Sequence, residues 1–537
     1  MADPSSTPNA DASRGAWNSK LGFILAASGS AIGLGNIVFF ASNAYQYGGG
    51  AFYLPYFIAL FVMGIPIMVL EFTVGTMTRR SIPLALGKLA GKKGEFVGWW
   101  SLASALTITM YYITILGWAL AMLVGSFGSL FEPGATAPFE PFLEPAAEVN
   151  SQVWFFNMIA TWWPLVAVSV IWMLTGLLLW KGTETIEKGV RVFVPLMWVF
   201  MIGLVIHGLT LPGGTDGVAY LFTPNLDGIT DIQVWQGAFA QMFFSLSLGL
   251  GTMVAYASYL PKDADNVNNS LLVSFLNCGF EYIAGIAIFA ILFVYALNPA
   301  GGTLSLSFFV IPQGIAGFSD LPVLVKGFGV FFFLLLVIAG LTSAVSLVEG
   351  MASALIDKLG ISRAKALALV MVPGVAGSLT FALPFIVDPG LSGDGTLGFT
   401  LFDLVDHWAF RYSLITVGLL ECLLVGWVVG ADKIRAAVNE HSKFQVPAFF
   451  DWMIKVIIPA ILGFVLIGTL IEDVTQEGGV YGFHWGVEAI GALPVVVPVV
   501  WLAFTVGLAA FLTTRRSHAT PPHHAGDPTL TAVDTHA

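Results

Sequence analysis

The chain has 537 residues, of which 57% are hydrophobic and only 10% are charged, and its formal net charge is −11. Soluble domains carry roughly 25% charged residues, so this composition excludes an ordinary soluble protein and indicates a polytopic membrane protein. The two cysteines, Cys278 and Cys422, both lie inside apolar stretches, which argues against a disulfide framework or a cysteine-rich metal cluster.

Residues 1–16 are polar and have no apolar core, so we predict a cytoplasmic tail there and not a cleaved signal peptide. Beyond this tail the chain repeats apolar runs of about 20 residues, the length that crosses a bilayer. We therefore predict an all-α integral membrane protein with twelve transmembrane helices, followed at 514–537 by a disordered cytoplasmic tail. The predicted spans are 17–42, 51–77, 97–127, 163–180, 190–212, 235–260, 270–297, 323–356, 364–386, 402–430, 453–472 and 488–513.

The distribution of charge indicates how these spans are oriented. Basic residues gather in every second loop, beginning with Arg79, Arg80 and Lys88 after the second span. The loop 128–162 on the other side contains four glutamates and no lysine or arginine. By the positive-inside rule both termini are cytoplasmic, and we expect a multi-pass protein of the cell (inner) membrane.

Two of the spans contain glycine-rich breaks. Residues 28–36 read Ser-Gly-Ser-Ala-Ile-Gly-Leu-Gly-Asn, and residues 245–251 read Ser-Leu-Ser-Leu-Gly-Leu-Gly. Each glycine weakens a helix by roughly 1 kcal/mol relative to alanine, and backbone groups freed inside a bilayer need other partners. A broken membrane helix of this kind is typical of a transporter, where it lines a binding cavity.

The breaks lie in the first and sixth spans and so divide the first ten spans into two sets of five. With an odd number of spans in each set, the sets must have opposite orientations. We therefore predict a first five-helix repeat at 17–212, a second, inverted repeat at 235–430, and a binding site between the two broken helices. The last two spans, at 453–513, stand outside the repeat, and we assign them to oligomerisation, for example in a homodimer, or to lipid contact.

Three motifs in the first repeat then show a family resemblance. They are Gly29-Ser-Ala-Ile-Gly-Leu-Gly-Asn36, Gly48-Gly-Gly-Ala-Phe-Tyr-Leu-Pro-Tyr56 and Gly64-Ile-Pro-Ile-Met-Val-Leu-Glu71. Together with Tyr111-Tyr112, Asn277 and Ala339-Gly-Leu-Thr-Ser343, they resemble the neurotransmitter:sodium symporter family, in particular its bacterial amino-acid transporters. The resemblance covers about residues 14–430 and implies the leucine-transporter-type fold, with a 5+5 inverted repeat and broken helices 1 and 6.

The resemblance implies two sodium ions. The first would be bound by Ala31, Asn36, Ser245 and Asn277 together with the carboxylate of the substrate, and the second by Gly29, Ile32, Ala339, Thr342 and Ser343. A single Asn or Thr in a membrane helix more often makes an interhelical hydrogen bond. Here the residues recur together at the family spacing, which favours sodium binding.

The resemblance also implies an amino-acid site. Its residues are Ser30, Ala31, Leu34, Gly35, Ile108, Tyr112, Phe244, Ser245, Ser247, Leu250, Ser343 and Leu347. The N–H groups of Leu34 and Gly35 and the Tyr112 hydroxyl would bind the carboxylate, while backbone carbonyls and Ser247 would bind the ammonium group. The rest of the lining is mostly apolar, so a neutral, apolar amino acid fits best, although aromatic and aliphatic residues at such positions are usually packing alone.

Glu281 is an ionisable residue inside the seventh span, and such residues tend to be functional. Chloride-dependent relatives have a serine at this position, so the resemblance implies that Glu281 substitutes for chloride and that transport is chloride-independent. Proton counter-transport by Glu281 is open, as is a neutral Glu281 hydrogen-bonded to Tyr56 or Gln241. For the other intramembrane acids, Glu71 and Glu421, we favour a structural role.

Two gates follow from the resemblance. The inner gate would contain Arg14, Trp17, Tyr259 and Asp357, with an Arg14–Asp357 pair closing the cytoplasmic path. The outer gate would contain Phe39, Tyr112, Phe244, Asp406 and Arg411.

The outer gate departs from the family pattern. Where the family has an arginine that pairs with the aspartate at Asp406, this chain has Phe39. We hypothesise that Arg411 supplies the missing cation, the alternative being that Arg411 extends to the outer headgroups. Ser30 replaces a common asparagine and Leu250 a common phenylalanine, so the substrate pocket is enlarged.

The sequence therefore predicts a sodium-coupled symporter that works by alternating access. A symporter for a small zwitterion or amine, or a sensor that binds an amino acid without transporting it, remains the alternative. No nucleophile–base pair shares a common depth, so we do not expect an enzyme. The Gly-Leu-Gly motif follows no strand, so we expect neither nucleotide binding nor a nucleic-acid partner. The expected partners are sodium, a small-molecule substrate and the lipid bilayer.

Overall fold

The computed structural model describes residues 16–134, 148–297, 302–387, 396–475 and 493–517, and every regular element within these ranges is helical. The first half contains α1 (Lys20–Ala31), η2 (Gly35–Phe39), α2 (Phe40–Gln46), α3 (Gly50–Ala59), η3 (Leu60–Gly64), α4 (Ile65–Thr78), α5 (Ile82–Phe127), α6 (Ser151–Ile159), α7 (Trp163–Leu179), α8 (Thr183–Thr210) and α9 (Gly214–Phe222).

The second half contains η4 (Gly228–Thr230), α10 (Ile232–Ser245), α11 (Thr252–Ala257), α12 (Asn266–Val294), α13 (Gly302–Ser305), η5 (Leu306–Val310), α14 (Ile311–Ala316), α15 (Pro322–Leu359), α16 (Arg363–Val387), α18 (Thr396–Asp406), η6 (His407–Leu414), α19 (Ile415–Leu423), η7 (Leu424–Gly430), α20 (Ala431–His441), α21 (Phe449–Trp452), η8 (Met453–Ile457), α22 (Ile458–Thr475) and α23 (Leu493–Thr514). The η elements are π-helical turns, apart from η4, which is a 3₁₀ turn.

The helices agree with the predicted membrane spans in kind and order. In the described ranges, nine helices are long and apolar enough to cross a membrane, or eleven if two bent pairs are each counted as one span. The bent pairs are α1 with η2–α2, at 56°, and α6 with α7, at 81°. The sixth predicted span consists of α10 and α11, with 14 and 6 residues, which are each too short to cross alone. A total of twelve spans is consistent with this arrangement.

Some boundaries differ from the sequence prediction. The third span begins in α5 at Ile82 and not near residue 97, because a short helix joins it at a kink where Gly91 has φ 68°. Stretches that we predicted as outer loops contain the helices α6, α9 and α14. The predicted tails at 1–16 and 514–537 lie largely outside the described residues, as do residues 135–147 of the predicted outer loop 128–162.

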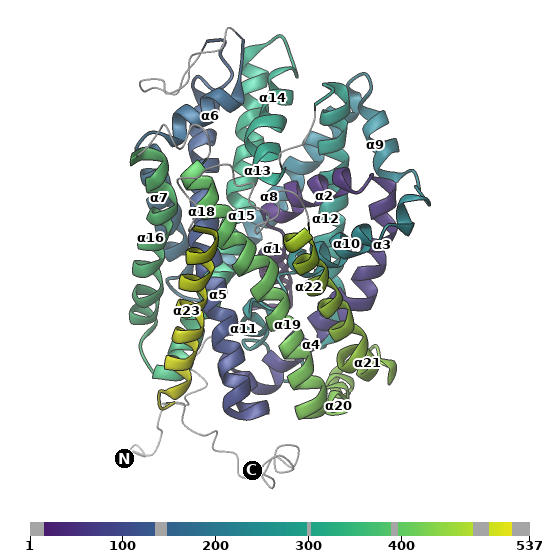
Figure 1. Cartoon of the computed structure of the whole chain (residues 1–537), viewed down its shortest axis with the longest axis vertical. Helices are drawn as coiled ribbons and strands as arrows, with labels where there is room; N and C mark the ends of the chain where they lie inside the picture. Colours follow the sequence, from purple (N-terminus) through teal and green to yellow (C-terminus); the bar gives the residue numbers. More distant parts are fainter. Residues whose placement is uncertain (1–15, 135–147, 298–301, 388–395, 476–492, 518–537) are drawn as a thin grey trace, which may run out of the picture.

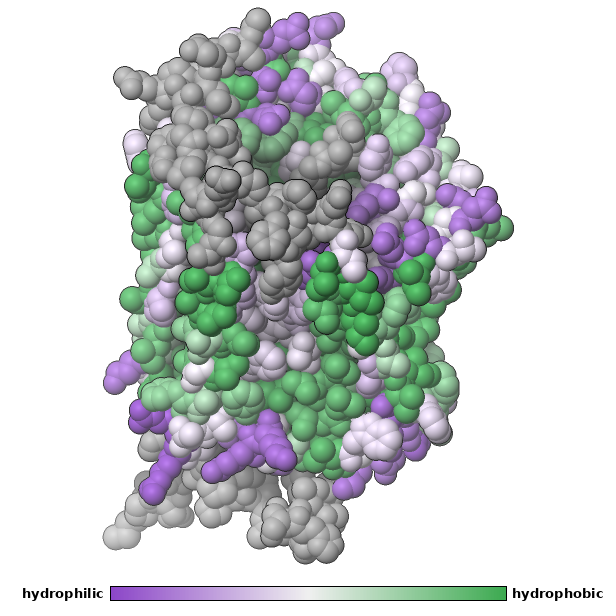
Figure 2. Space-filling model, viewed as in Figure 1, coloured by the Kyte–Doolittle hydropathy of each residue, from purple (hydrophilic) through white to green (hydrophobic). Residues whose placement is uncertain are grey.

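The surface is divided along the long axis of the molecule. Figure 2 shows hydrophobic residues over much of the middle, with most hydrophilic residues toward the two ends. The exposed side chains on α8, α22 and α23 include many large hydrophobic residues, among them Val199, Leu470 and Val500. This distribution fits helices that contact lipid in the middle and water at the ends.

Both broken helices lie inside the bundle. α1 packs against α8, α12 and α15, and α11 packs against α4 and α15 (Figure 1). The long helices α5 and α15 also pack along each other. The breaks are therefore enclosed by continuous helices, which can supply partners for backbone groups that the breaks leave free.

Candidate functional site

The first predicted break lies where α1 ends at Ala31 and η2 begins at Gly35. The Asn36 side chain accepts a hydrogen bond from the Gly33 N–H at 2.8 Å, and the Asn36 N–H donates to the Gly33 carbonyl at 3.2 Å. These two bonds hold the chain between Ala31 and Gly35 out of regular helix. The last carbonyls of α1 thus end near the centre of the bundle without helical partners.

The second predicted break separates α10, which ends at Ser245, from α11, which begins at Thr252. Three residues of this segment have positive φ, namely Ser247 at 54°, Gly249 at 72° and Gly251 at 71°. The Gly249 N–H donates to Glu71 Oε1 at 2.8 Å, and the Gly249 carbonyl accepts from the Ser101 hydroxyl at 2.7 Å. Side chains of α4 and α5 therefore replace the helical partners of this backbone, as a membrane interior requires.

Three uncharged side chains connect the two breaks. Asn36 Nδ2 lies 2.7 Å from Asn277 Oδ1 and 3.3 Å from Ser245 Oγ, and Asn277 Nδ2 also donates to Ser245 Oγ. Asn36, Ser245 and Asn277 are 1%, 4% and 0% exposed. They are the predicted side-chain ligands of the first sodium ion, and their converging oxygens suit a hard cation that needs no acidic ligand of its own.

The second predicted sodium set lies between α1 and α15. The Thr342 hydroxyl donates to the Ala339 carbonyl at 2.8 Å, and the Ser343 hydroxyl lies 3.3 Å from the same oxygen. A Cβ atom on Gly29 would lie 3.6 Å from Thr342 Cβ, which brings the end of α1 against this turn of α15. The Ile32 N–H donates to the Ser28 carbonyl at 2.7 Å. The donor set of hydroxyl and carbonyl oxygens fits sodium, as in the first set.

Tyr112 of α5 and Ser343 of α15 both lie close to the first break. The Tyr112 hydroxyl accepts a long hydrogen bond from the Leu34 N–H at 3.4 Å. A Cβ atom on Gly33 would lie only 2.8 Å from Ser343 Oγ and 3.0 Å from the Tyr112 hydroxyl, so these groups leave room for glycine alone. Hydroxyl and N–H donors are thus gathered at one end of the gap between the breaks, where they can bind a carboxylate.

The remaining predicted substrate residues are mostly buried. Ile108, Leu250 and Leu347 are 5%, 7% and 7% exposed, and Phe244 is half-buried. The Ser247 hydroxyl donates to the Ser30 carbonyl at 3.4 Å. The Ser30 hydroxyl donates to Ser346 Oγ at 2.6 Å, a partner that we did not predict. The lining is therefore apolar with a small serine cluster at the α1–α15 side.

Glu281 is fully buried and accepts a hydrogen bond from Gln241 Nε2 at 2.9 Å. Gln241 Oε1 in turn accepts from Asn43 Nδ2 at 2.9 Å. The Tyr56 hydroxyl donates to Cys278 Sγ at 3.4 Å, so of the two partners considered from the sequence the structure pairs Glu281 with Gln241. Glu281 lies one helical turn beyond Asn277 on α12, which places a carboxyl group directly beside the first sodium set.

Comparison with known proteins places this site in context. The family model described as "Sodium:neurotransmitter symporter family" matches residues 14–137 and 157–513. The chain belongs to this family. An uncharacterized sodium-dependent transporter of Methanocaldococcus jannaschii is 38% identical over 505 residues, which cover 92% of this chain and 97% of that protein. The sodium- and chloride-dependent GABA transporter 2 of Homo sapiens is 28% identical over 519 residues, covering 89% and 84% of the two chains.

A solved structure shows the same fold. The symporter resembles MhsT in complex with L-phenylalanine with a TM-score of 0.72 and 32% sequence identity, over 84% of this chain and 99% of that one. The predicted all-α, leucine-transporter-type membrane fold is thereby confirmed, and with it membership of a family of sodium-dependent transporters.

At the end of the symporter that is predicted to face the cytoplasm, two aromatic residues fasten the broken helices. The Trp17 indole donates to the Tyr256 carbonyl at 2.8 Å, and the Tyr259 hydroxyl donates to Glu349 Oε1 at 2.6 Å. Glu349 is 0% exposed and forms an ion pair with Arg363, which also donates to the Leu179 carbonyl at 2.7 Å. Glu349 and Arg363 were not predicted as gate residues. The feature of the sequence that could have indicated Glu349 is its position as an acidic residue inside the eighth predicted span.

The predicted Arg14–Asp357 pair involves a residue outside the described ranges. Asp357 is 5% exposed and accepts hydrogen bonds from the Ser81 N–H at 2.9 Å and the Ser81 hydroxyl at 3.0 Å. Arg80 Nη1 lies 3.6 Å from its other oxygen. Asp357 thus connects α15 to the turn between α4 and α5, and Arg80 supplies a cation at this point.

At the end that is predicted to face outward, three aromatic rings lie together. Phe244 and Phe410 are stacked with centroids 4.0 Å apart, and Phe410 lies 6.4 Å from Phe39 in a second stacked pair. Arg411 is exposed, and within the described residues no ion pair joins it to Asp406 or to any other acidic side chain. This arrangement has no direct salt bridge between Arg411 and Asp406, and the hypothesis that Arg411 supplies the missing cation of the outer gate stays a hypothesis.

The other intramembrane acids pack in the interior. Glu71 is 0% exposed and binds the second break through Gly249, as described above. Glu421 is 1% exposed, and neither of its oxygens has a hydrogen-bond partner among the described residues. The contact of Glu71 with the Gly249 backbone is consistent with the structural role that we favoured for it.

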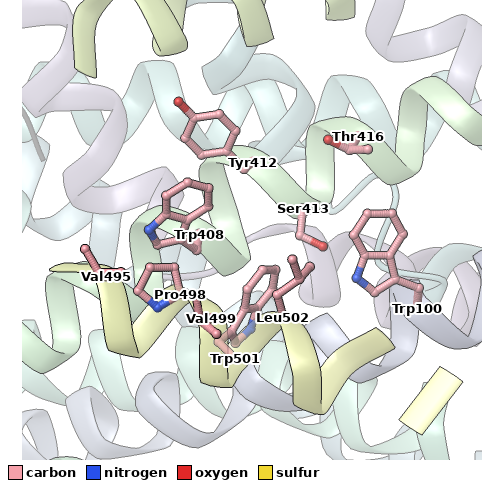
Figure 3. A pocket seen from close by; sticks show the side chains of 10 residues that line it. All are labelled: Trp100, Trp408, Tyr412, Ser413, Thr416, Val495, Pro498, Val499, Trp501 and Leu502. Atoms are coloured by element: carbon pink, nitrogen blue, oxygen red, sulfur yellow. The ribbon is translucent and has the colours of Figure 1, made fainter. Parts of the chain in front are cut away.

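A cavity of about 320 Å³ lies away from this site (Figure 3). It is bordered by α5, by η6 and α19, and by α23, so it lies where the last predicted span meets the second repeat and α5. None of the predicted sodium or substrate residues is in its lining, which consists of Trp100, Trp408, Tyr412, Ser413, Thr416, Val495, Pro498, Val499, Trp501 and Leu502.

Proposed function

We propose that this protein imports a neutral, apolar amino acid together with two sodium ions by alternating access. The observation that carries the proposal is the buried triangle of Asn36, Ser245 and Asn277 between the two helix breaks. These side chains supply oxygens for an ion next to the Leu34 and Gly35 N–H groups, which can bind a carboxylate. An ion that shares the substrate carboxylate is coupled to the substrate directly.

The class of substrate follows from the lining. The α-carboxylate would lie at Leu34, Gly35 and Tyr112, and the ammonium group would lie at Ala31, Phe244 and Ser245 carbonyls with the Ser247 hydroxyl. The side chain would then contact Ile108, Leu250 and Leu347, which are apolar, so a charged side chain would lose its hydration without a partner. The solved relative that is named for its complex with L-phenylalanine supports this class.

The second sodium ion would bind at Gly29, Ile32, Ala339, Thr342 and Ser343. Glu281 would provide the negative charge that chloride provides in relatives named as chloride-dependent, so transport would not require chloride. With the cytoplasmic termini predicted by the positive-inside rule, sodium and the amino acid would enter the cell across its inner membrane.

A second candidate is a symporter for a small zwitterion. Several relatives are named for such solutes, including the creatine transporter of Torpedo marmorata and the taurine transporter of Rattus norvegicus, at 27% and 26% identity. Leu250 and Ser30 at positions where the family often has larger residues favour this alternative, because they leave the pocket wider.

A binding screen separates these candidates. Purified protein would be tested with the twenty amino acids, taurine, creatine and betaine, in sodium and in potassium, by the shift in melting temperature. We expect apolar amino acids alone to stabilise the protein, and only in sodium. A response limited to taurine or creatine would favour the second candidate, and stabilisation that is equal in sodium and potassium would contradict both.

A further inference from the structure

A row of three aromatic rings crosses the outer side of the substrate region. The Phe244 and Phe410 rings have centroids 4.0 Å apart and planes inclined by 25°, and the Phe410 and Phe39 rings are 6.4 Å apart and inclined by 24°. All three side chains are half-buried. Phe410 is the central member of the row, because it contacts both of the others.

The three rings come from elements that must separate if the site is to open outward. Phe39 is the last residue of η2 on the outer half of the first broken helix, and Phe244 is the penultimate residue of α10 on the outer half of the second. Phe410 lies in η6. Because Phe410 bridges the outer halves of both broken helices, the row can close only when these three elements are close together.

Charged residues near the row do not form a comparable connection. Arg411, the next residue after Phe410, is exposed, and Asp406 is half-buried in the preceding helix α18. The described part of the chain contains no ion pair for either of them. Asp473 of α22 is engaged by residues of the same element as Phe410, because it binds His407 at 2.7 Å and Tyr412 at 2.6 Å.

We propose that Phe410, stacked between Phe39 and Phe244, is the residue that seals the outer gate of this symporter. The seal is apolar: it excludes water from the site by ring stacking and not by attraction between an arginine and an aspartate. The inference rests on the proposed function in one respect, namely that the substrate binds beneath Phe244.

The proposed seal has a definite physical signature. Stacked aromatic pairs contribute about 0.5–1.5 kcal/mol beyond the area that they bury, a factor of roughly two to ten in the closed-to-open ratio. Surface ion pairs are screened by salt, whereas aromatic stacking is not. Closure of the outer gate should therefore weaken by this factor on removal of a ring and should change little between low and high ionic strength.

The chain offers a clean background for an accessibility measurement. Its two cysteines, Cys278 and Cys422, are 2% and 0% exposed. A single reporter, Ile108→Cys, would lie beneath Phe244 on α5. The rate at which a membrane-impermeant cationic thiol reagent modifies the reporter in sodium buffer, with choline chloride varied from 20 to 500 mM, then measures access through the outer gate.

We expect Phe410→Ala to raise the modification rate of the reporter by about two- to tenfold, and Phe39→Ala to raise it similarly. Phe410→Tyr, which keeps the ring, should leave the rate near that of the reporter alone. Phe61→Ala is the matched control, because Phe61 is 45% exposed on η3 and contacts Phe57 and Phe275 away from the site. Arg411→Ala should have no effect.

An unchanged modification rate in both Phe410→Ala and Phe39→Ala would overturn the proposal. A faster rate in Arg411→Ala alone would also overturn it, if high salt produces the same rise in the reporter protein without a gate substitution. The screen described for the proposed function does not depend on this rate. If the protein binds amino acid only in sodium but its gate is ionic, the screen would support the proposed function while the modification rates would contradict the aromatic seal.

Discussion

The Tyr259 hydroxyl donates a hydrogen bond of 2.6 Å to Glu349, and Arg363 holds the same carboxylate from the other side. Tyr259 follows α11, the inner half of the second broken helix, whereas Glu349 and Arg363 belong to the continuous helices α15 and α16. These contacts thus join the second broken helix to two continuous helices, at the end of the molecule that is predicted to face the cytoplasm.

We predict that Arg363→Ala destabilises the protein by about 3–5 kcal/mol, because Glu349 is left as a buried charge without a cation. The melting temperature in detergent should fall clearly. Lys188→Ala is the control, since the Lys188–Glu184 pair is exposed on α8 and its loss should change the melting temperature little. Equal melting temperatures for the two variants would contradict this role of Arg363, and Arg363→Ala combined with Glu349→Gln should recover part of the loss.

Asn277→Ala should weaken sodium binding and substrate binding together. The side chain lies within hydrogen-bond distance of both Asn36 and Ser245, and the ion proposed there would share the substrate carboxylate. We expect the sodium concentration for half-maximal binding and the amino-acid Kd each to rise at least about tenfold, the effect of losing one oxygen ligand and leaving polar groups unpaired. Asn268→Ala, on the same helix, should change neither. Loss of one affinity without the other would argue against a shared carboxylate.

Gly33→Ala tests the first break without changing charge or hydrogen-bonding groups. The added Cβ would lie 2.8 Å from Ser343 Oγ and 3.0 Å from the Tyr112 hydroxyl, so one of these groups must move. We predict that substrate binding falls below detection while the protein remains folded by gel filtration. Gly463→Ala on α22 is the comparison, because a Cβ there meets nothing within 4 Å. Wild-type binding by Gly33→Ala would show that Tyr112 and Ser343 do not define the site.

Glu281→Ser should convert transport from chloride-independent to chloride-dependent. The substitution removes the carboxyl group that accepts from Gln241 and leaves a buried space beside Asn277 that lacks a negative charge. Uptake would be compared in sodium chloride and sodium gluconate. We expect wild-type uptake to be the same in both and the variant to transport in chloride only; a variant that is equally active in gluconate would separate Glu281 from chloride independence.

The sequence predicted the parts of this molecule that depend on local composition. Glycines at 33, 35, 249 and 251 identified both breaks. Glycine weakens a helix, and the backbone groups that it frees inside a bilayer need other partners. The resemblance to the family grouped Asn36, Ser245 and Asn277 as sodium ligands, and the fold brings these side chains together.

Contacts between distant helices were harder to predict. In the sequence, Arg363 indicates only which side of the membrane its loop faces. Nothing in its neighbourhood shows that it reaches Glu349, 14 residues away on another helix. Phe410 was missed for a different reason. Sequence periodicity assumes 3.6 residues per turn, whereas η2 and η6 are π-helical, and the wider turns rotate the side chains that follow. Arg411, the neighbour of Phe410, entered the gate hypothesis instead, because its charge could replace the cation that is absent at Phe39.

Uptake into proteoliposomes tests most directly whether this chain is a sodium-coupled importer of apolar amino acids. Radiolabelled L-phenylalanine and L-leucine would be supplied outside vesicles under an inward sodium gradient, with an inward potassium gradient as the control. We predict accumulation of at least one of them above its external concentration in sodium and none in potassium. Sodium-dependent binding of these amino acids without any accumulation would contradict transport and would indicate a sensor.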